Sequence, residues 1–306
     1  METIDTIRIN FEEGQLFILN ICLAFLMFGV ALDIKISDFT AIFKRPKAPI
    51  IGLISQLILL PILTIGLIYL LQPPPSLALG MILISVCPGG NVSNFAVHLA
   101  GANAALSVML TSIVTLSAIF VTPLYFGFWT NFIPGTEQFN SIIEVSPAKM
   151  MNTILTLVFL PLIIGMFLNH RYPSVTKRIE KPVRLLSILV FLCFVVFAIA
   201  GNYDNIVQYV HLVFFLVLIH NTLAFTMGYW FARLNRLPVY DAQAISIETG
   251  IQNSGLGLIL IFNFFDGIGG MAMIAAWWGI WHLLSGFALA TYWSKKRKND
   301  LKTDIS

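Results

Sequence analysis

The chain has 306 residues, of which 58% are hydrophobic and only 11% are charged, and its mean hydropathy is +0.85. Soluble domains carry roughly 25% charged residues, so a chain this poor in charge cannot cover its surface in water. The net charge of +3 comes from short basic clusters between apolar stretches. These clusters form no face for a nucleic-acid backbone, and the sequence predicts an all-α polytopic protein whose surroundings are the lipid bilayer.

A helix needs about 20 mostly apolar residues to cross about 30 Å of hydrocarbon. The sequence offers nine such segments, at residues 14–34, 48–71, 77–98, 104–126, 150–170, 184–201, 211–233, 242–265 and 271–294. The connections between them are too short for a separate soluble domain. The acidic N-terminal stretch is not followed by a small-residue cleavage site, so we expect the first span to be retained. A single membrane domain over residues 1–306 is the prediction.

The basic residues predict an orientation, because Lys and Arg concentrate in cytoplasmic connections. With nine spans and a cytoplasmic C-terminus, the N-terminus is outside and only Arg8 and Lys149 are on the outer side. The other basic residues are cytoplasmic: Lys35, Lys44, Arg45, Lys47, Arg171, Lys177, Arg178, Lys181, Arg184, Arg233, Arg236, Lys295, Lys296, Arg297, Lys298 and Lys302. The lack of long extensions favours an integral protein of a bacterial inner membrane.

Two of the nine segments contain polar, glycine-punctuated interruptions. The third contains residues 85–94, SVCPGGNVSN, and the eighth contains residues 248–255, ETGIQNSG. A single Pro or Gly break in a membrane helix is often a simple kink. Paired breaks at corresponding places in two halves are instead typical of transporters with an inverted repeat. The predicted half-repeats are residues 14–126 and 150–294.

Glu248 is the one charged residue that the pattern places deep within a span. A charge there costs about 2.5–3.5 kcal/mol or more, so we expect it to face a cavity and to have a partner. No Lys or Arg is expected at the same depth, which leaves a bound cation, sodium or a proton. The alternative is a structural carboxylate that stays protonated or caps a helix.

Oxygen donors around Glu248 favour sodium, a hard cation that prefers several oxygen ligands. Ser107 and Thr111 are four residues apart and share one helix face, although such a pair also commonly bonds to helix carbonyls. The other expected donors are Ser93, Asn94, Gln56 and the carbonyl oxygens of Thr249 and Ile251. No nucleophile–base pair or His/Cys metal cluster stands out, so we predict no enzyme activity.

The broken helices also predict an anionic solute. Each break leaves a half-helix N-terminus, whose free N–H groups and positive dipole end attract anions near the bilayer midplane. This argument defines a sign of charge and no particular molecule. His220, Asn221 and His282 are expected to form hydrogen bonds between helices, with a place beside the solute path as the alternative for His282.

The two interruptions resemble the signature crossover motifs of the bile acid:sodium symporter family. Further matching positions are Asp38-Phe39, Arg45-Pro46-Lys47, Gln56 with Pro61, Ser107 with Thr111, and Trp281-His282 with Ser285-Gly286. The resemblance covers residues 15 to 294, and the chain is most similar to the nine-helix members of the family. The resemblance implies a core (residues 48–126 and 211–294) that contains two broken, crossing helices. This core is expected to move against a panel (residues 14–34 and 150–201) in alternating access.

The resemblance also implies a set of binding residues. One sodium is expected at Ser93, Asn94, Ser107, Thr111 and Glu248. A second is expected at Gln56, Glu248, Gln252 and the backbone oxygens of Thr249 and Ile251. The expected solute contacts are Gly90, Asn91, Asn253, Ser254 and His282.

Two positions depart from the family pattern on the solute side. Members often have Thr at the place of Asn91 and Asn at the place of Leu283. The expected function is sodium-coupled symport of an organic anion, either bile acid-like or a smaller carboxylate such as pantoate or a 2-oxo acid. The alternatives are proton-coupled transport or sodium/proton exchange through Glu248, and a non-transporting membrane receptor. Nothing in the sequence specifies an oligomeric state.

Overall fold

The computed structural model describes residues 4–9, 13–32, 46–90, 92–136, 139, 147–180, 182–183, 185–186, 189 and 203–303. The regular secondary structure of these residues is helical, and the extended contacts among them are two isolated antiparallel bridges, Arg8 with Ile268 and Gly89 with Gln252. The predicted polytopic helical membrane protein is confirmed. The number of nine spans stays a prediction, because most of residues 184–201 lie outside the described part of the chain.

Five helical stretches in this part of the chain are long and apolar enough to cross a membrane. Three shorter apolar helices accompany them at Leu16–Gly29, Pro75–Val86 and Ser254–Phe264. The five long stretches are Lys47–Leu71, Ala104–Thr130, Ala148–Arg171, Gln208–Leu234 and Gly269–Arg297. Several helices run beyond the predicted segments, since polar residues at a membrane surface continue a helix as readily as apolar ones.

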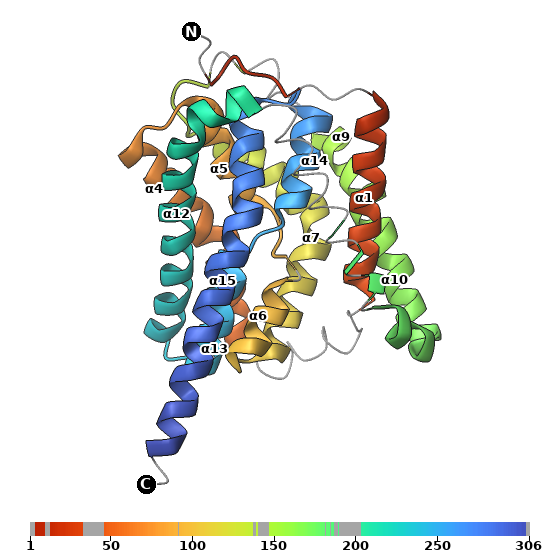
Figure 1. Cartoon of the computed structure of the whole chain (residues 1–306), viewed down its shortest axis with the longest axis vertical. Coiled ribbons are helices and arrows are strands. Elements are labelled where there is room, and N and C mark those ends of the chain that lie inside the picture. The colour runs from red at the N-terminus through yellow and green to blue at the C-terminus, as the bar shows by residue number, and fades with distance from the viewer. Residues whose placement is uncertain are drawn as a thin grey trace.

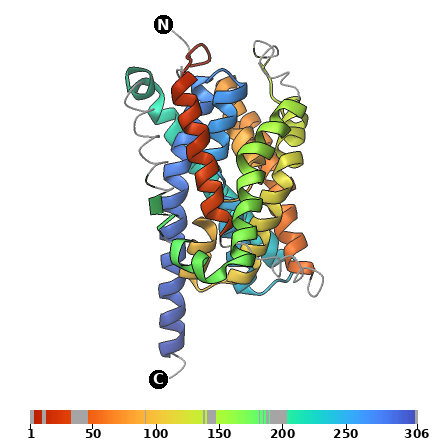
Figure 2. The same cartoon turned by 90° about the vertical axis from the view of Figure 1, so that its right-hand side faces the viewer.

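The helices form two neighbouring groups (Figure 1). On one side, helix α1 (Glu13–Ala31) packs along α10 (Leu160–Arg171), which belongs to the same span as α9 (Pro147–Ile154), as Figure 2 also shows. On the other side lie α12 (Tyr203–Leu234), α13 (Val239–Gly250) and α15 (Gly269–Thr303). Helices α5 (Pro75–Val86), α6 (Val92–Ala100), α7 (Ala104–Thr130) and α14 (Ser254–Phe264) complete the bundle.

Two spans each have a π-helical turn in their middle. Helix α3 (Lys47–Ile54) continues through η1 (Ser55–Leu59) into α4 (Leu60–Leu71), and α9 continues through η3 (Leu155–Phe159) into α10. In both cases the turn lies directly before a Leu-Pro pair, Pro61 or Pro161. A proline ring clashes with the carbonyl one turn earlier and removes one hydrogen bond, and a widened turn accommodates both effects. The turn in η1 contains Gln56, one of the predicted sodium ligands.

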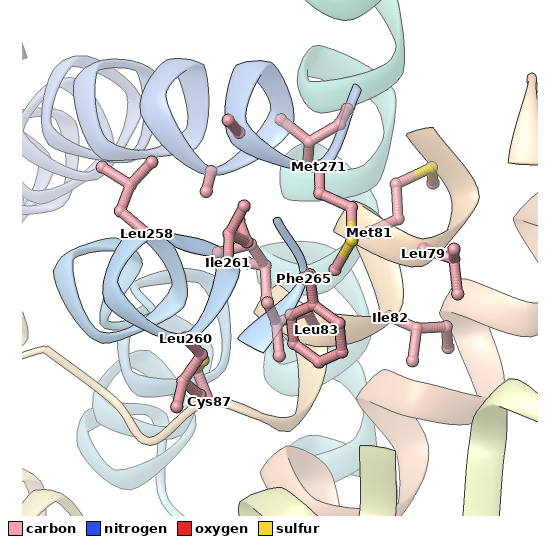
Figure 3. Packing of buried hydrophobic residues seen from close by; sticks show 14 of the residues in the cluster. Leu79, Met81, Ile82, Leu83, Cys87, Leu258, Leu260, Ile261, Phe265 and Met271 are labelled. Carbon is pink, nitrogen blue, oxygen red and sulfur yellow. The ribbon is translucent and has the colours of Figure 1, made fainter. Parts of the chain in front are cut away.

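The interior is built around the two interrupted helices. Every residue of α5 from Ser76 to Val86 is buried, and so is α14 from Ser254 to Ile261. Figure 3 shows Leu83 and Cys87 of the first interrupted segment packed with Leu260 and Phe265 of the second. Because these short helices are enclosed by other helices, their polar breaks lie inside protein rather than against lipid, where unpaired backbone would be costly.

Candidate functional site: two helix breaks around Glu248

The first break follows directly from the local sequence. Helix α5 ends at Val86, and Cys87 has extended backbone (φ −69°, ψ 152°) because it precedes Pro88. Helix α6 starts again at Val92, after Gly89 and Gly90. The structure therefore interrupts the third predicted span within residues 85–94, where the sequence indicated a break. Asn91 lies outside the described residues.

The second break begins at the end of α13. The helix stops at Gly250, Ile251 is extended (φ −105°, ψ 107°), and the side chain of Asn253 caps α14 by accepting a 3.0 Å hydrogen bond from the Leu256 N–H. An Asn side chain at this position satisfies one of the free N–H groups of the new helix. The interruption lies within the predicted residues 248–255.

The two breaks meet as a short antiparallel pair. Gly90 N–H donates to the carbonyl of Ile251 at 3.2 Å, and Asn253 N–H donates to the carbonyl of Pro88 at 2.8 Å. Gly89 and Gln252 are opposite one another in this bridge. Backbone groups freed by one break are thus satisfied by the other, which allows unwound backbone at membrane depth.

Glu248 is fully buried next to this pair. Its Oε1 accepts hydrogen bonds from Ser93 Oγ at 2.5 Å and from Ser107 Oγ. Its Oε2 accepts from Thr111 Oγ1 at 2.9 Å and from Gln56 Nε2 at 3.5 Å. Within the part of the chain that the structure describes, no Lys or Arg forms an ion pair with Glu248.

Asn94 completes the first group of predicted ligands. Its Oδ1 accepts from Ser107 Oγ at 2.7 Å and from Thr111 Oγ1 at 3.3 Å. The structure therefore brings Ser93, Asn94, Ser107 and Thr111 together with Glu248, from α6, α7 and α13. The face-sharing of Ser107 and Thr111 is used here for contacts to other helices.

The hydroxyl groups in this cluster lie near more acceptor oxygens than they have hydrogens to donate. Ser93, Ser107 and Thr111 carry one hydrogen each, yet each hydroxyl lies within hydrogen-bond distance of two acceptor oxygens. The acceptors are Gly90 O, Asn94 Oδ1 and the two Glu248 oxygens. Half of these close oxygen–oxygen contacts therefore lack a hydrogen. A hard cation prefers several oxygen ligands, so this group of oxygens, here called the oxygen cage, suits one.

The second group of predicted ligands comes from the second break and from Gln56 of η1. Gln252 Nε2 donates to the Thr249 carbonyl at 2.9 Å, and the Ile251 carbonyl accepts from Gly90. Among the described residues, neither Gln56 Oε1 nor Gln252 Oε1 has a hydrogen-bond partner, although both side chains are buried. A buried carbonyl-type oxygen without a partner is costly, so these atoms suit a cation as well.

The remaining predicted contacts are spread around the same break. Ser254 is buried in the first turn of α14, and Asn253 Nδ2 points to Met27 Sδ of α1 at 3.8 Å. His282 is buried on α15. His220 does bond between helices, since its Nε2 lies 2.8 Å from Thr64 Oγ1.

Two residues of the cluster were not part of the sequence argument. Ser55 Oγ lies 2.8 Å from Thr249 Oγ1, and a Cβ at Gly89 would lie 3.2 Å from Glu248 Oε2. A buried Ser beside Gln56 and a Gly within the first break were the available signals. Gly89 therefore brings the backbone close to the carboxylate.

Comparison with known proteins identifies the family of this chain. The family model described as the sodium bile acid symporter family matches residues 20–209, which is more than half of the chain. The chain belongs to the sodium bile acid symporter family. Members are transporters, so this protein is a sodium-dependent membrane transporter and not an enzyme.

Individual relatives cover almost the whole chain. It is 36% identical over 280 residues to the uncharacterized sodium-dependent transporter YocS of Bacillus subtilis, covering 92% of this chain and 84% of that protein. It is 30% identical to the probable sodium/metabolite cotransporter BASS2 of rice, over 94% of this chain and 66% of the rice protein. The probable cotransporter BASS6 of Arabidopsis thaliana is 31% identical, with 90% and 68% covered.

Proposed function

We propose that this protein is a secondary active transporter that carries an organic anion across the membrane together with sodium. The observation that supports it best is the buried Glu248 carboxylate, which lies among more acceptor oxygens than hydrogens. The printed name of the rice relative, a sodium/metabolite cotransporter, agrees with this proposal.

Two sodium ions are proposed to bind on the two sides of Glu248. The first takes oxygens from Ser93, Asn94, Ser107, Thr111 and Glu248. The second takes Gln56, Gln252, Glu248 and the carbonyl oxygens of Thr249 and Ile251. The oxygen excess supports the first site, and the buried unpaired amide oxygens of Gln56 and Gln252 support the second. Because the two ions would share one carboxylate, the binding of each is expected to affect the binding of the other.

The anion is proposed to bind beside the paired breaks. Its contacts are Gly90, Asn91, Asn253, Ser254 and His282, and the first turns of α6 and α14 supply N–H groups and positive dipole ends. Asn91 and Leu283 differ from the usual family residues, so the proposed substrate class includes both bile acid-like anions and smaller carboxylates. Sodium bound at Glu248 would contact residues next to both breaks. It would therefore favour the arrangement of the two breaks that holds the anion.

The proposed architecture is one transporter domain with two inverted half-repeats, residues 14–126 and 150–294, and nine spans. Residues 48–126 and 211–294 form the core, and residues 14–34 and 150–201 form the panel. Helix α1 packs along α10 and η3, which belong to the same proposed panel, and this packing supports the grouping. Movement of the core against the panel would then expose the site to each side in turn.

The proposed location is a bacterial inner membrane, with the N-terminus outside and the C-terminus cytoplasmic. Residues 4–9 pack against Gly267 and Gly269 at the start of α15, while Arg297 near its other end reaches Gly101. These contacts lie at opposite ends of the bundle (Figure 1). That separation supports termini on opposite sides of the membrane.

Uptake into proteoliposomes tests the proposal. Bile acids, pantoate and 2-oxo acids are offered under an inward sodium gradient, with potassium replacing sodium as the control. We expect at least one of these anions to accumulate only with sodium, and Glu248→Gln to abolish the accumulation. Glu180→Gln, the same substitution outside the cluster, is expected to keep it.

Other outcomes would favour the alternative functions. Uptake that follows a pH gradient and ignores sodium would replace the proposal with proton coupling at Glu248. Stoichiometric anion binding without flux would favour a receptor. Sodium-driven uptake that survives Glu248→Gln unchanged would remove Glu248 from the coupling site.

A further inference from the structure

The carbonyl groups at the end of α13 are oriented by three different partners. The last carbonyls of any helix lack partners within the helix. Here Gln252 Nε2 donates to Thr249 O at 2.9 Å, Asn221 Nδ2 to Gly250 O at 2.7 Å, and Gly90 N–H to Ile251 O at 3.2 Å. Thr249 O and Ile251 O are therefore held from the side of the two breaks, while Gly250 O is held by α12.

Asn221 is a polar residue in a mostly apolar helix. It is fully buried in the middle of α12, and its carboxamide contacts the end of α13 rather than its own helix. Because a backbone carbonyl only accepts hydrogen bonds, the group that faces Gly250 O must be the NH₂ end of the amide. Asn221 Oδ1 then points the other way.

Ser285 on α15 supports this orientation of the amide. Its Oγ lies 2.7 Å from Asn221 Oδ1 and 2.9 Å from the Trp281 carbonyl of its own helix. A flipped amide would point Oδ1 at the Gly250 carbonyl, which cannot donate, and the Ser285 hydroxyl can donate to Oδ1 only in the orientation described. Ser285, Asn221 and Gly250 O thus form one hydrogen-bonded chain across α15, α12 and α13.

Packing leaves this segment little room to move. A Cβ at Gly250 would lie 2.4 Å from the Phe225 ring, and a Cβ at Gly286 would lie 2.9 Å from Ile251 Cδ1. Helices α12 and α15 therefore hold the backbone of residues 250–251 in place from two sides. What packing alone does not set is the rotation of the Gly250 peptide, because glycine has no side chain to prevent it.

We infer that Asn221 is a positioning residue for sodium coupling, with Ser285 as its support. Its hydrogen bond keeps the Gly250 carbonyl turned toward α12. The flanking carbonyls of Thr249 and Ile251 are then kept on the side of Gln56 and Gln252, where the second sodium is proposed to bind. This inference deepens the proposed function and rests on it for the identity of the ion.

A matched pair of substitutions tests the chain of hydrogen bonds. Ser285→Thr keeps the hydroxyl, whereas valine in Ser285→Val has the shape of threonine but no hydroxyl. Asn221→Ala removes the donor to Gly250. The readout is the rise in unfolding temperature of the full-length protein in detergent as sodium replaces potassium, since a ligand that binds the folded state stabilises it.

We expect Asn221→Ala and Ser285→Val to raise the half-saturating sodium concentration about tenfold, in line with the loss of one buried hydrogen bond. The steepness of the sodium dependence should also fall toward that of one ion. Ser285→Thr should behave like the unmodified protein. If Asn221→Ala does not fold, the Thr/Val pair decides alone.

An unchanged sodium titration in a variant that is merely less stable would overturn the inference, because a structural bond has only that effect. Equal behaviour of Ser285→Thr and Ser285→Val would remove Ser285 from it. Uptake by the unmodified protein in proteoliposomes is measured in parallel. Failure of that uptake with an intact sodium titration rejects the proposed function alone, whereas no sodium response in either assay rejects both.

Discussion

The backbone N–H of Asn253 donates a 2.8 Å hydrogen bond to the carbonyl oxygen of Pro88. Residues 165 positions apart thus satisfy each other's backbone at the point where both helices are interrupted. Gly90 and Ile251 make the reciprocal contact, so neither break can change its backbone without affecting the other. A ligand of Glu248, which lies beside this pair, would therefore act on both half-helices at once.

This joint structure gives a physical route from ion binding to solute binding. Glu248 belongs to α13, while three of its hydroxyl partners come from α6 and α7. An ion bound among them, as proposed, would draw together helices on the two sides of the paired breaks. The first turns of α6 and α14, where the anion is proposed to bind, directly follow these breaks and would move with them.

Thr111→Val tests the oxygen cage. Valine has the shape of threonine but lacks the hydroxyl that contacts Glu248 Oε2 and Asn94 Oδ1. Loss of one ligand oxygen in a buried, charged cluster costs about 1.5–3 kcal/mol, which is roughly a tenfold or greater rise in the sodium concentration for half-maximal uptake. Sodium titration of uptake measures it.

Thr115→Val is the matched control, the same substitution one turn further along α7. It is expected to leave the sodium dependence unchanged, because Thr115 has no contact with the Glu248 cluster among the described hydrogen bonds. An equal effect of both substitutions would mean that Thr111 acts through general packing of α7 and not through the ion.

Gly89→Ala tests the close approach of the first break to the carboxylate. The added Cβ would lie 3.2 Å from Glu248 Oε2 and 3.7 Å from Ile251 O, so the carboxylate must shift by a few tenths of an ångström. We expect weaker sodium activation with folding retained. Gly66→Ala on α4, where a Cβ meets nothing within 4 Å, should behave like the unmodified protein in the same uptake assay.

Sequence reasoning predicted the helix breaks because their causes are local. Pro88 forces Cys87 out of helical geometry, and Asn253 caps the next helix, whatever surrounds them. The depth of Glu248 followed from its apolar neighbours in the same span. Interruptions of this kind can therefore be predicted from single residues within an apolar segment.

Contacts between distant segments were less accessible. The sequence indicated that Asn221 would bond to another helix, but its partner is a backbone carbonyl, and every residue has one. Ser55 and Gly89 were missed for a related reason, since their roles depend on which face of a helix meets Thr249 or Glu248. Helix rotation about its axis is set by tertiary packing and leaves little trace in an almost uniformly apolar segment.

Arg297 connects the ends of helices from both halves of the chain. Its guanidinium donates to Gly101 O in the α6–α7 turn and, at 3.0 Å, to Gln243 Oε1 of α13, and it lies 4.6 Å from the centre of the Tyr240 ring. Arg297→Lys keeps the charge but loses the planar fork. We expect an unfolding temperature in detergent lower by about 3–6 °C.

Lys296→Ala is the control for Arg297, because Lys296 is the adjacent basic residue and is exposed. It should leave the unfolding temperature within about 1 °C, as expected for an exposed surface substitution. Equal shifts for the two variants would indicate that the net charge of this end, and not the specific contacts of Arg297, stabilises the fold.

The last contact to test joins α1 to α14. Asn20 and Asn263 form a reciprocal amide pair, with Nδ2–Oδ1 distances of 3.3 Å and 3.0 Å. In the proposed architecture this pair lies across the boundary between panel and core, so it would hold this boundary closed in the conformation described. Side-chain hydrogen bonds between membrane helices contribute about 0.6 kcal/mol on average, a roughly threefold effect on a conformational equilibrium.

A double-mutant cycle separates the pair from its surroundings. Asn20→Ala and Asn263→Ala should each lower the unfolding temperature, and the double variant should be destabilised by less than the sum of the two, since the first substitution already removes the shared contact. Asn263→Ala should have the larger single effect, because Asn263 Nδ2 also donates to the Ile259 carbonyl at 2.9 Å. Strictly additive shifts would show that the two amides do not interact, and α1 would then be held against α14 by apolar packing alone.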